Sequence, residues 1–284
     1  MFLSIIIPVY NTPVKFLKEC LDSLKFIPSF ITSEIIIVND GSKDEETLTY
    51  LSSLDKLKYQ IISQQNKGLS SARNEGIKVA KGVYIFPLDS DDVLNKNFEG
   101  FINYLQNNSE VDVLYGDLLY FGDTNKVEKK QEFNKIALWF ESNIIPACSF
   151  FKKRAWETVG GYDESLKTFE DYDFWIQLAV NNFKFKYLPC ATYNYRLINN
   201  GASLYQSTRA LHKTYFKIIR DKIPTKEITF LGIRDFMKGY YVKKAKSDDT
   251  VLKVFVNYIK TFVKTLEMLK RIMLSSLRKA KLIK

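Results

Sequence analysis

The chain has 284 residues, 46% of them hydrophobic and 26% charged, which is typical of a globular protein with one large α/β domain and an appendage, or with two modest domains. No apolar run approaches the roughly 18 residues needed to span a bilayer, and residues 1–10 lack the basic segment and cleavage site of a signal peptide. Three widely separated cysteines form no disulfide framework or metal-binding spacing, so we expect buried thiols in a reducing cytosol.

The net charge of +10 is unevenly distributed. Residues 225–284 contain 15 Lys or Arg and 5 Asp or Glu, whereas residues 1–224 contain 27 of each kind. This separation favours a balanced body and a basic tail that is attracted to an anionic partner. We therefore predict a body over residues 1–215, with halves 1–110 and 111–215, and a helical basic tail over residues 216–284.

The first hundred residues alternate between strand and helix patterns. Residues 2–10 form an apolar, β-branched run, which predicts a strand buried on both faces. Helices are expected at residues 14–24, 42–54 and 68–80, and further strands at residues 33–42, 59–65 and 83–89. Ser42 or Asp44 can cap the second of these helices. The alternation predicts an α/β fold with a doubly wound, mainly parallel sheet flanked by helices.

The second half of the body has a looser pattern. We expect one or two strands within residues 111–123, an exposed loop at 126–134, a strand and a helix stopped by two glycines within 149–164, a helix at 170–182 and a strand at 184–197.

Polar residues follow three of the expected parallel strands. They are Tyr10-Asn11, Asp40-Gly41 and the run from Asp89 to Asp92. The carboxyl ends of parallel strands share one edge of a sheet, where ligands bind. Each cluster alone has a structural explanation as a turn or a helix cap, but their common edge favours a binding site.

Three carboxylates occur within the four residues from Asp89 to Asp92. Two carboxylates about 4 Å apart repel each other by roughly 4 kcal/mol at an effective dielectric constant of 20. A divalent cation such as Mg²⁺ or Mn²⁺, shared with a diphosphate, would remove this repulsion. A bare Asp-x-Asp is also common in solvated loops, so this pattern alone does not establish a metal site.

Six segments in order resemble the motifs of the family 2 glycosyltransferases, inverting enzymes with the Rossmann-like GT-A fold. They are SIIIPVYN (4–11), IIIVNDGS (35–42), NKGLSSARNEGI (66–77), LDSDD (88–92), GGYDE (160–164) and FEDYDFW (169–175). The resemblance covers about residues 3–203 and implies a nucleotide-diphosphate sugar as donor. No comparable motif marks the tail.

The resemblance implies a role for several residues of the nucleotide-binding half. Pro8, Tyr10 and Asn11 would line the nucleotide pocket, and Asp40 would hydrogen-bond the base. Arg73 would lie near the base and the diphosphate, where a cation at the start of a helix suits an anion; its alternative is an ordinary surface cation.

The acidic motifs are assigned in the same way. Asp91 would ligate the metal directly, and Asp89 would contact the ribose or the metal shell. The interpretation for Asp92 is a cap of the following helix. Asp171, after Glu170, would be the general base that deprotonates the acceptor hydroxyl; its alternative is an acidic residue that stabilises the helix dipole.

Three further expectations concern the neighbours of these motifs. Asp173 is expected to be structural, and Tyr172 and Trp175 either stack on sugars or belong to the core. Arg196 would clamp the diphosphate. Many relatives have a histidine just after this arginine, but Leu197 stands here, so the third metal ligand is left open; His212 is expected at the surface.

These assignments predict a metal-dependent inverting glycosyltransferase that uses Mn²⁺ or Mg²⁺. It would transfer one sugar from a donor, expected to be a UDP-sugar, to a glycan or lipid-linked acceptor. The expected process is surface polysaccharide synthesis. Two alternatives are a sugar nucleotidyltransferase, which the absence of glycine from residues 8–16 disfavours, and a catalytically silent relative that binds a nucleotide-sugar or a partner protein.

The tail combines apolar residues at helical spacing with many cations. The apolar positions are Leu252, Phe255, Val256, Ile259, Phe262, Val263, Leu266, Leu269 and Met273. Such a helix can lie on an anionic membrane surface or pack against the body or a second subunit. We expect a cytoplasmic protein, peripheral at the inner face of the cell membrane or a homodimer, with no nucleic-acid partner.

Overall fold

The computed structural model of the protein describes residues 1–140, 143–198, 207–224, 267–268 and 270–271. The chain divides into two compact units, residues 1–222 and 223–284. The first unit holds the elements discussed below. The apolar stripe of the tail lies outside the described residues, so its membrane and subunit alternatives stay predictions, as does the boundary at residue 215.

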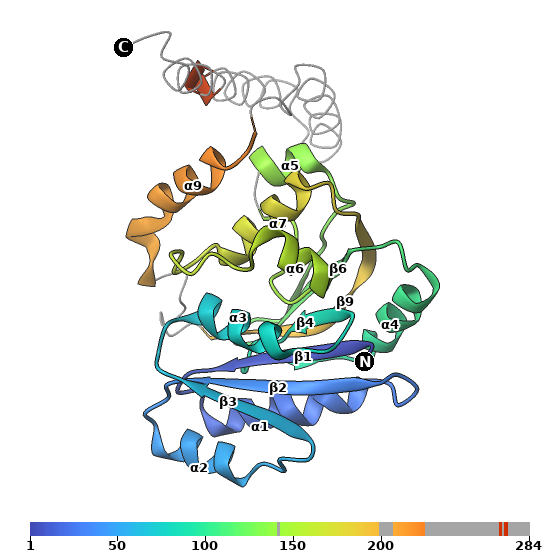
Figure 1. Ribbon diagram of the computed structural model, residues 1–284, viewed down its shortest axis with the longest axis vertical. Coiled ribbons are helices and arrows are strands. Elements are labelled where there is room, and N and C mark those ends of the chain that lie inside the picture. The colour runs from blue at the N-terminus through green and yellow to red at the C-terminus, as the bar shows by residue number, and fades with distance from the viewer. Residues whose placement is uncertain (141–142, 199–206, 225–266, 269, 272–284) are drawn as a thin grey trace. The chain divides into compact units, whose positions relative to one another are not determined.

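The first unit is built on a nine-stranded sheet with the order β3-β2-β1-β4-β8-β6-β9-β5, and β7 pairs with β6 (Figure 1). The strands are β1 (Leu3–Val9), β2 (Ser33–Asp40), β3 (Tyr59–Gln64), β4 (Tyr84–Pro87), β5 (Val93–Leu94), β6 (Val113–Gly122), β7 (Lys126–Glu128), β8 (Phe150–Lys152) and β9 (Phe185–Leu197).

The helices are α1 (Val14–Ser23), α2 (Glu45–Ser53), α3 (Leu69–Val79), α4 (Phe98–Asn107), α5 (Lys135–Phe140), α6 (Lys153–Val159), α7 (Glu170–Val180) and α9 (His212–Asp221). Two short 3₁₀ turns, Leu24–Phe26 and Arg209–Leu211, follow α1 and precede α9. The predicted α/β fold with flanking helices is confirmed, and Asp44 caps α2 by accepting the N–H of Thr47 at 2.8 Å.

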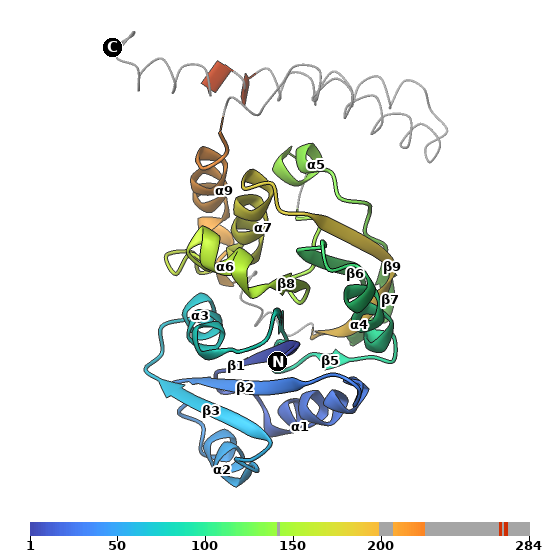
Figure 2. The same ribbon diagram turned by 45° about the vertical axis from the view of Figure 1, so that its right-hand side comes forward.

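The parallel part of the sheet is the half that the sequence predicted best. β3, β2, β1 and β4 are parallel neighbours, and all seven residues of β1 are buried. α3 lies on one face of these strands and α1 on the other (Figures 1 and 2). Gly76 lets α3 approach the sheet closely, because a Cβ atom there would lie 2.6 Å from Cγ2 of Ile6.

The second half of the sheet mixes parallel and antiparallel strands, whereas the parallel pairing predicted from the first hundred residues is confirmed. β8 is antiparallel to both β4 and β6, whereas β6 and β9 are parallel. The predicted loop at 126–134 contains β7, which forms a hairpin with β6. β5, β7 and β8 have only two or three residues each. Such short strands show no periodic pattern in the sequence.

α7 packs its apolar residues on the sheet. The ring of Phe151 in β8 lies 4.9 Å from Phe174 and 5.9 Å from Trp175, centroid to centroid. Trp175 is fully buried, and buried Tyr172 donates its hydroxyl to the Leu138 carbonyl at 2.7 Å. Both side chains belong to the core, so neither can stack on a sugar in this arrangement.

Among the described helices, none has the length and apolarity that crossing a membrane requires.

Candidate active site

The three polar clusters meet at one edge of the sheet, as predicted. Val9 ends β1 beside Asn39 of β2, and β4 lies on the other side of β1. The loop from Asp89 to Asp92 leaves β4 at the same carboxyl edge. This edge follows from parallel pairing alone, because parallel strands end on the same side of a sheet.

Asn11 and Asp40 organise the loops around the predicted nucleotide pocket. Asn11 has a left-handed backbone, with φ at 48°, and its Oδ1 accepts the N–H groups of Lys43 and Asp44 at 2.7 and 3.1 Å. Buried Asp40 accepts the N–H groups of Lys67 and Gly68, both at 2.9 Å. Both side chains therefore hold backbone at the edge of the sheet.

The other two residues predicted to line this pocket differ in exposure. Pro8 is buried within β1, and the side chain of Tyr10 is half exposed just beyond the strand. A half-exposed aromatic ring at the carboxyl edge is available to a ligand, whereas Pro8 contributes to the packing of the sheet. Contact of either residue with a nucleotide stays a prediction.

Arg73 is completely buried between two carboxylates. Its Nη2 lies 2.7 Å from Oδ1 of Asp89, and its Nη1 lies 2.7 Å from Oε1 of Glu170. Burial acts to lower the pKa of Arg73, but the two carboxylates raise the pKa well above its ordinary value, so the guanidinium stays charged. Arg73 thus joins the loop after β4 to the start of α7, and its predicted contact with a donor stays a prediction.

The loop after β4 concentrates negative charge. Burial, and then the charge of Asp89, raise the pKa of Asp91 to about 6. Burial, and then Asp91 and Asp89, also raise the pKa of Asp92 well above its ordinary value. Burial is the main cause of both raised pKa values, and repulsion among the neighbouring carboxyl groups adds to it, with Arg196 acting in the opposite direction.

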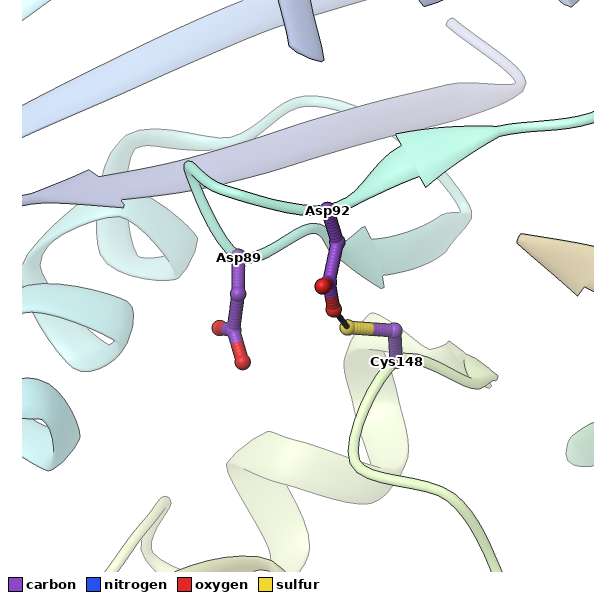
Figure 3. A group of neighbouring side chains, drawn as sticks. All are labelled: Asp89, Asp92 and Cys148. Carbon is purple, nitrogen blue, oxygen red and sulfur yellow. Dashed lines mark hydrogen bonds between the residues drawn. The ribbon is translucent and has the colours of Figure 1, made fainter. Parts of the chain in front are cut away.

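Asp92 does not cap a helix. It is fully buried, and its Oδ1 accepts the backbone N–H of Arg196 at 2.8 Å, while the next helix, α4, begins only at Phe98. Asp92 also points toward Cys148, and ligand atoms of Asp89, Asp92 and Cys148 lie within 4.8 Å of one another (Figure 3). Asp92 therefore ties β9 to the loop after β4.

These residues fit a hard divalent cation better than a soft one. Burial, and then Asp89 and Asp92, raise the pKa of the Cys148 thiol well above its ordinary value, and a protonated thiol is a poor ligand. Carboxylate oxygens suit Mg²⁺ and Mn²⁺. Arg73 binds one oxygen of Asp89, which leaves the other oxygen for a cation. The carboxylate of Asp89 is thus a suitable ligand, and ligation by Asp91, which is outside the group of Asp89, Asp92 and Cys148, stays a prediction.

Arg196 lies beside this loop in a fixed position. Its Nε donates to the Asp91 carbonyl at 2.7 Å, and its Nη2 contacts Oε2 of Glu19 on α1 at 2.5 Å. The rings of Phe16 and Phe121 each lie 4.3 Å from the guanidinium carbon. Two aromatic contacts and a backbone acceptor orient a guanidinium strongly.

The two acidic residues at the start of α7 have different surroundings. Glu170 is buried and faces Arg73, whereas Asp171 is partly exposed. Asp171 accepts the side-chain amide of Asn143 at 2.7 Å and the N–H of Tyr172 at 2.8 Å. Burial, and then Glu170, raise the pKa of Asp171 to about 7. Asp171 can therefore exchange a proton near neutral pH.

Sequence reasoning missed three residues of this site. Glu19 is a half-buried residue of α1, Asn143 follows α5 in a loop, and Cys148 precedes β8. No motif marks them, because each acts through a contact between distant parts of the chain. Asp173, expected to be structural, is buried and lies 2.8 Å from Nζ of Lys222.

Comparison with known proteins decides the family. Residues 4–165 match the family model described as glycosyl transferase family 2. The chain belongs to glycosyl transferase family 2. It is 30% identical over 288 residues to an uncharacterized glycosyltransferase of Rickettsia typhi, covering 90% of this chain and 88% of that protein.

Two further relatives of this family 2 glycosyltransferase connect it to known proteins. A minor teichoic acid biosynthesis protein of Bacillus subtilis is 29% identical over 225 residues, which is 75% of this chain and 25% of that protein. The crystal structure of S. aureus TarS 1–349 in complex with UDP-GlcNAc is similar, with a TM-score of 0.60 and 21% identity over 78% of this chain and 70% of that one. The structural likeness confirms the fold.

Proposed function

We propose that this family 2 glycosyltransferase transfers a sugar from a UDP-sugar to a surface glycan or lipid-linked acceptor, with inversion at the anomeric carbon. One observation carries the proposal: Arg73 pairs with Glu170 and Asp89, whereas Asp171, next to Glu170, keeps a partly exposed carboxyl group with a pKa raised to about 7. A similar fold in a UDP-GlcNAc complex and a relative in teichoic acid synthesis support the donor and acceptor classes.

Asp171 is proposed as the general base. Its carboxylate takes the proton of the acceptor hydroxyl as the oxygen attacks the anomeric carbon from the face opposite the diphosphate. Asn143 and the N–H of Tyr172 each hold one carboxylate oxygen and fix its orientation. A single displacement with one base inverts the configuration.

Asp91 and Asp89 are proposed to hold Mn²⁺ or Mg²⁺, which supplies Lewis-acid stabilisation of the leaving diphosphate when bound. Arg196 offers a second positive charge beside the same loop, oriented by Phe16 and Phe121. Asn11, Asp40 and Tyr10 are proposed to form the nucleotide end of the site. Arg73 is proposed to support the donor by fixing Asp89.

The proposal is tested by incubating the purified protein with Mn²⁺, an acceptor mixture from a glycan-bearing cell envelope and a panel of UDP-sugars, and measuring released UDP. The anomeric configuration of the product, read from its ¹H coupling constant, tests inversion. Release of pyrophosphate in place of UDP would indicate nucleotidyl transfer. Binding of a UDP-sugar without turnover would indicate a catalytically silent relative.

A thermal-shift experiment tests the metal site independently of turnover. Mn²⁺ with UDP is expected to raise the melting temperature of the wild type, because a ligand at 100 times its Kd stabilises the native state by about 2.7 kcal/mol. Asp91→Asn removes a charged ligand and should abolish the shift. Glu99→Gln, at an exposed acidic residue on α4, is the matched control and should keep it. An equal shift in the Asp91 variant would exclude Asp91 as a ligand.

Glu19→Gln is expected to lower the KM for the donor about two- to fivefold, equivalent to about 0.5–1 kcal/mol. Arg196 stays oriented by the Asp91 carbonyl and the two aromatic rings, so the main loss is the negative charge that opposes the diphosphate. The control is Asp22→Asn, an exposed residue on the same helix that undergoes the same change of charge. A KM that rises in the Glu19 variant alone would show that Glu19 helps to bind the donor.

A further inference from the structure

The residue that precedes the acidic pair has an unusual backbone. Phe169 is the N-cap of α7 and has φ at 63° and ψ at 17°, in the left-handed region. A bulky aromatic residue rarely adopts this conformation, and it persists only where the surrounding structure imposes it. The side chain of phenylalanine has no donor or acceptor, so Phe169 cannot cap α7 with a side-chain hydrogen bond. The turn that leads into Glu170 and Asp171 is therefore held by packing rather than by a local cap.

The packing comes from α9. The ring of Phe169 lies 4.8 Å from that of His212 and 4.5 Å from that of Phe216, centroid to centroid. Both partners are on α9, and both are half-buried. His212 was expected to be a surface residue, and its contact with Phe169 corrects that expectation. Two rings on one helix thus hold the strained residue.

α9 also contacts the first turn of α7 on the other side of the acidic pair. The ring of Phe216 lies 5.9 Å from that of Tyr172. Nζ of Lys222, at the end of α9, lies 2.8 Å from Oδ2 of Asp173 and 2.8 Å from Oδ2 of Asp163. The contacts of α9 with α7 therefore fall immediately before and immediately after Glu170 and Asp171.

We propose that α9 is a positioning element for the general base: through Phe216, His212 and Lys222 it holds the left-handed turn at Phe169 and the first turn of α7, and so fixes the direction of the Asp171 carboxylate. The inference rests on the proposed function, because it assigns Asp171 as the base. α9 does not contact the reacting atoms; it acts through Phe169, Tyr172 and Asp173.

The placement of these contacts argues for positioning rather than for general stability. Arg73 already fixes the Glu170 carboxylate at the start of α7, whereas the Asp171 carboxylate is held only by Asn143 and by the N–H of Tyr172 among the described side chains and amides. The pairing of Glu170 with Arg73 does not hold the Asp171 side chain, so a change in the first turn of α7 would redirect the Asp171 carboxylate. α9 contacts the two residues, Phe169 and Tyr172, that such a change would displace.

The test uses the full chain and two variants, Phe216→Ala and Lys222→Met. Each is expected to lower kcat at least tenfold for the donor identified by the panel, with a donor KM within twofold of the wild-type value. The matched control is Lys217→Met, which makes the same change of charge at an exposed position of α9 and should leave kcat unchanged. Phe216→Leu, which retains an apolar side chain, should recover most of the activity.

Hydrogen exchange separates this inference from the proposed function. The amide of Asp173 donates to the Phe169 carbonyl at 2.9 Å, and its exchange should accelerate at least tenfold in Phe216→Ala but not in Lys217→Met. Unchanged exchange, or faster exchange with wild-type kcat in both test variants, overturns the role of α9. A wild-type protein that turns over no UDP-sugar, with exchange behaving as expected, overturns the proposed function instead. A donor KM that rises as kcat falls would show a general structural role.

Discussion

Asp171→Asn is expected to lower kcat by about 10²–10⁴-fold, the contribution of general base catalysis. The substitution keeps the shape of the side chain and its contact region with Asn143 but removes the group that accepts the proton. Donor binding should persist, because the substitution leaves the Asp89–Arg73 pair at the loop after β4 unchanged. The measurement is kcat and KM for UDP release, with Glu157→Gln on exposed α6 as the matched control. A variant with more than a tenth of the wild-type kcat would falsify the assignment.

The pH dependence of the same variant has a defined sign. The pKa of Asp171 is raised from an ordinary value of 3.8 to about 7, so the folded protein keeps this proton at pH values where the unfolded chain has lost it. The resulting stabilisation is present in full below about pH 4 and is lost as the pH rises to about 7. Asparagine has no such titration. The melting temperature of Asp171→Asn relative to the wild type should therefore be higher at pH 8 than at pH 5.

Catalysis depends on the opposite protonation state. As the proposed general base, Asp171 acts as a carboxylate, so kcat of the wild type should rise with pH to a plateau above about pH 7. Deprotonation of Asp171 near pH 7 therefore removes the stabilisation described above and at the same time produces the carboxylate that is proposed to act as the base. A rate profile that is flat between pH 5 and pH 8, with chemistry limiting, would contradict this assignment.

The parallel half of the fold was predictable because its signals are local. β1 to β4 are apolar runs whose pairing partners are dictated by the alternation of strand and helix, and right-handed crossovers leave few topologies. The mixed half was not predictable. β8 contributes only Phe150–Lys152, and its antiparallel pairing with β4 and β6 joins residues far apart in the chain. Such pairing depends on tertiary packing that a three-residue segment does not encode.

The candidate site shows the same division. Asp40, Asp89 and Asp91 were placed at one edge because they follow parallel strands, and the structure brings these strand ends together. The sequence could not show which charges pair. Arg73 and Glu170 are 97 positions apart, and Arg196 and Glu19 are 177 positions apart, yet each pair is in contact. Only the fold determines that Arg73 is buried, and burial makes it a partner for two carboxylates.

Arg73→Met is expected to destabilise the protein by about 3–5 kcal/mol, because it leaves Asp89 and Glu170 without their common cation. Methionine fills much of the space of the arginine stem, so the loss reflects charge more than packing. The free energy of unfolding from denaturant titration measures it. Arg154→Met is the matched control: its side chain is 61% exposed, and its partner Asp112 also binds Lys152, so the expected cost is about 0–1 kcal/mol.

A second substitution distinguishes loss of charge from loss of packing. Adding Glu170→Gln to Arg73→Met removes one of the two unpaired carboxylates, so the double variant should regain part of the lost stability even though it has one more change. If packing dominated, the second substitution would add to the loss. If Arg73→Met cost less than about 1 kcal/mol, water would solvate Asp89 and Glu170 in the absence of the guanidinium. The contacts of Arg73 with the loop after β4 and with α7 would then contribute little to stability. Recovery in the double variant would show that Arg73 contributes to stability mainly through its charge.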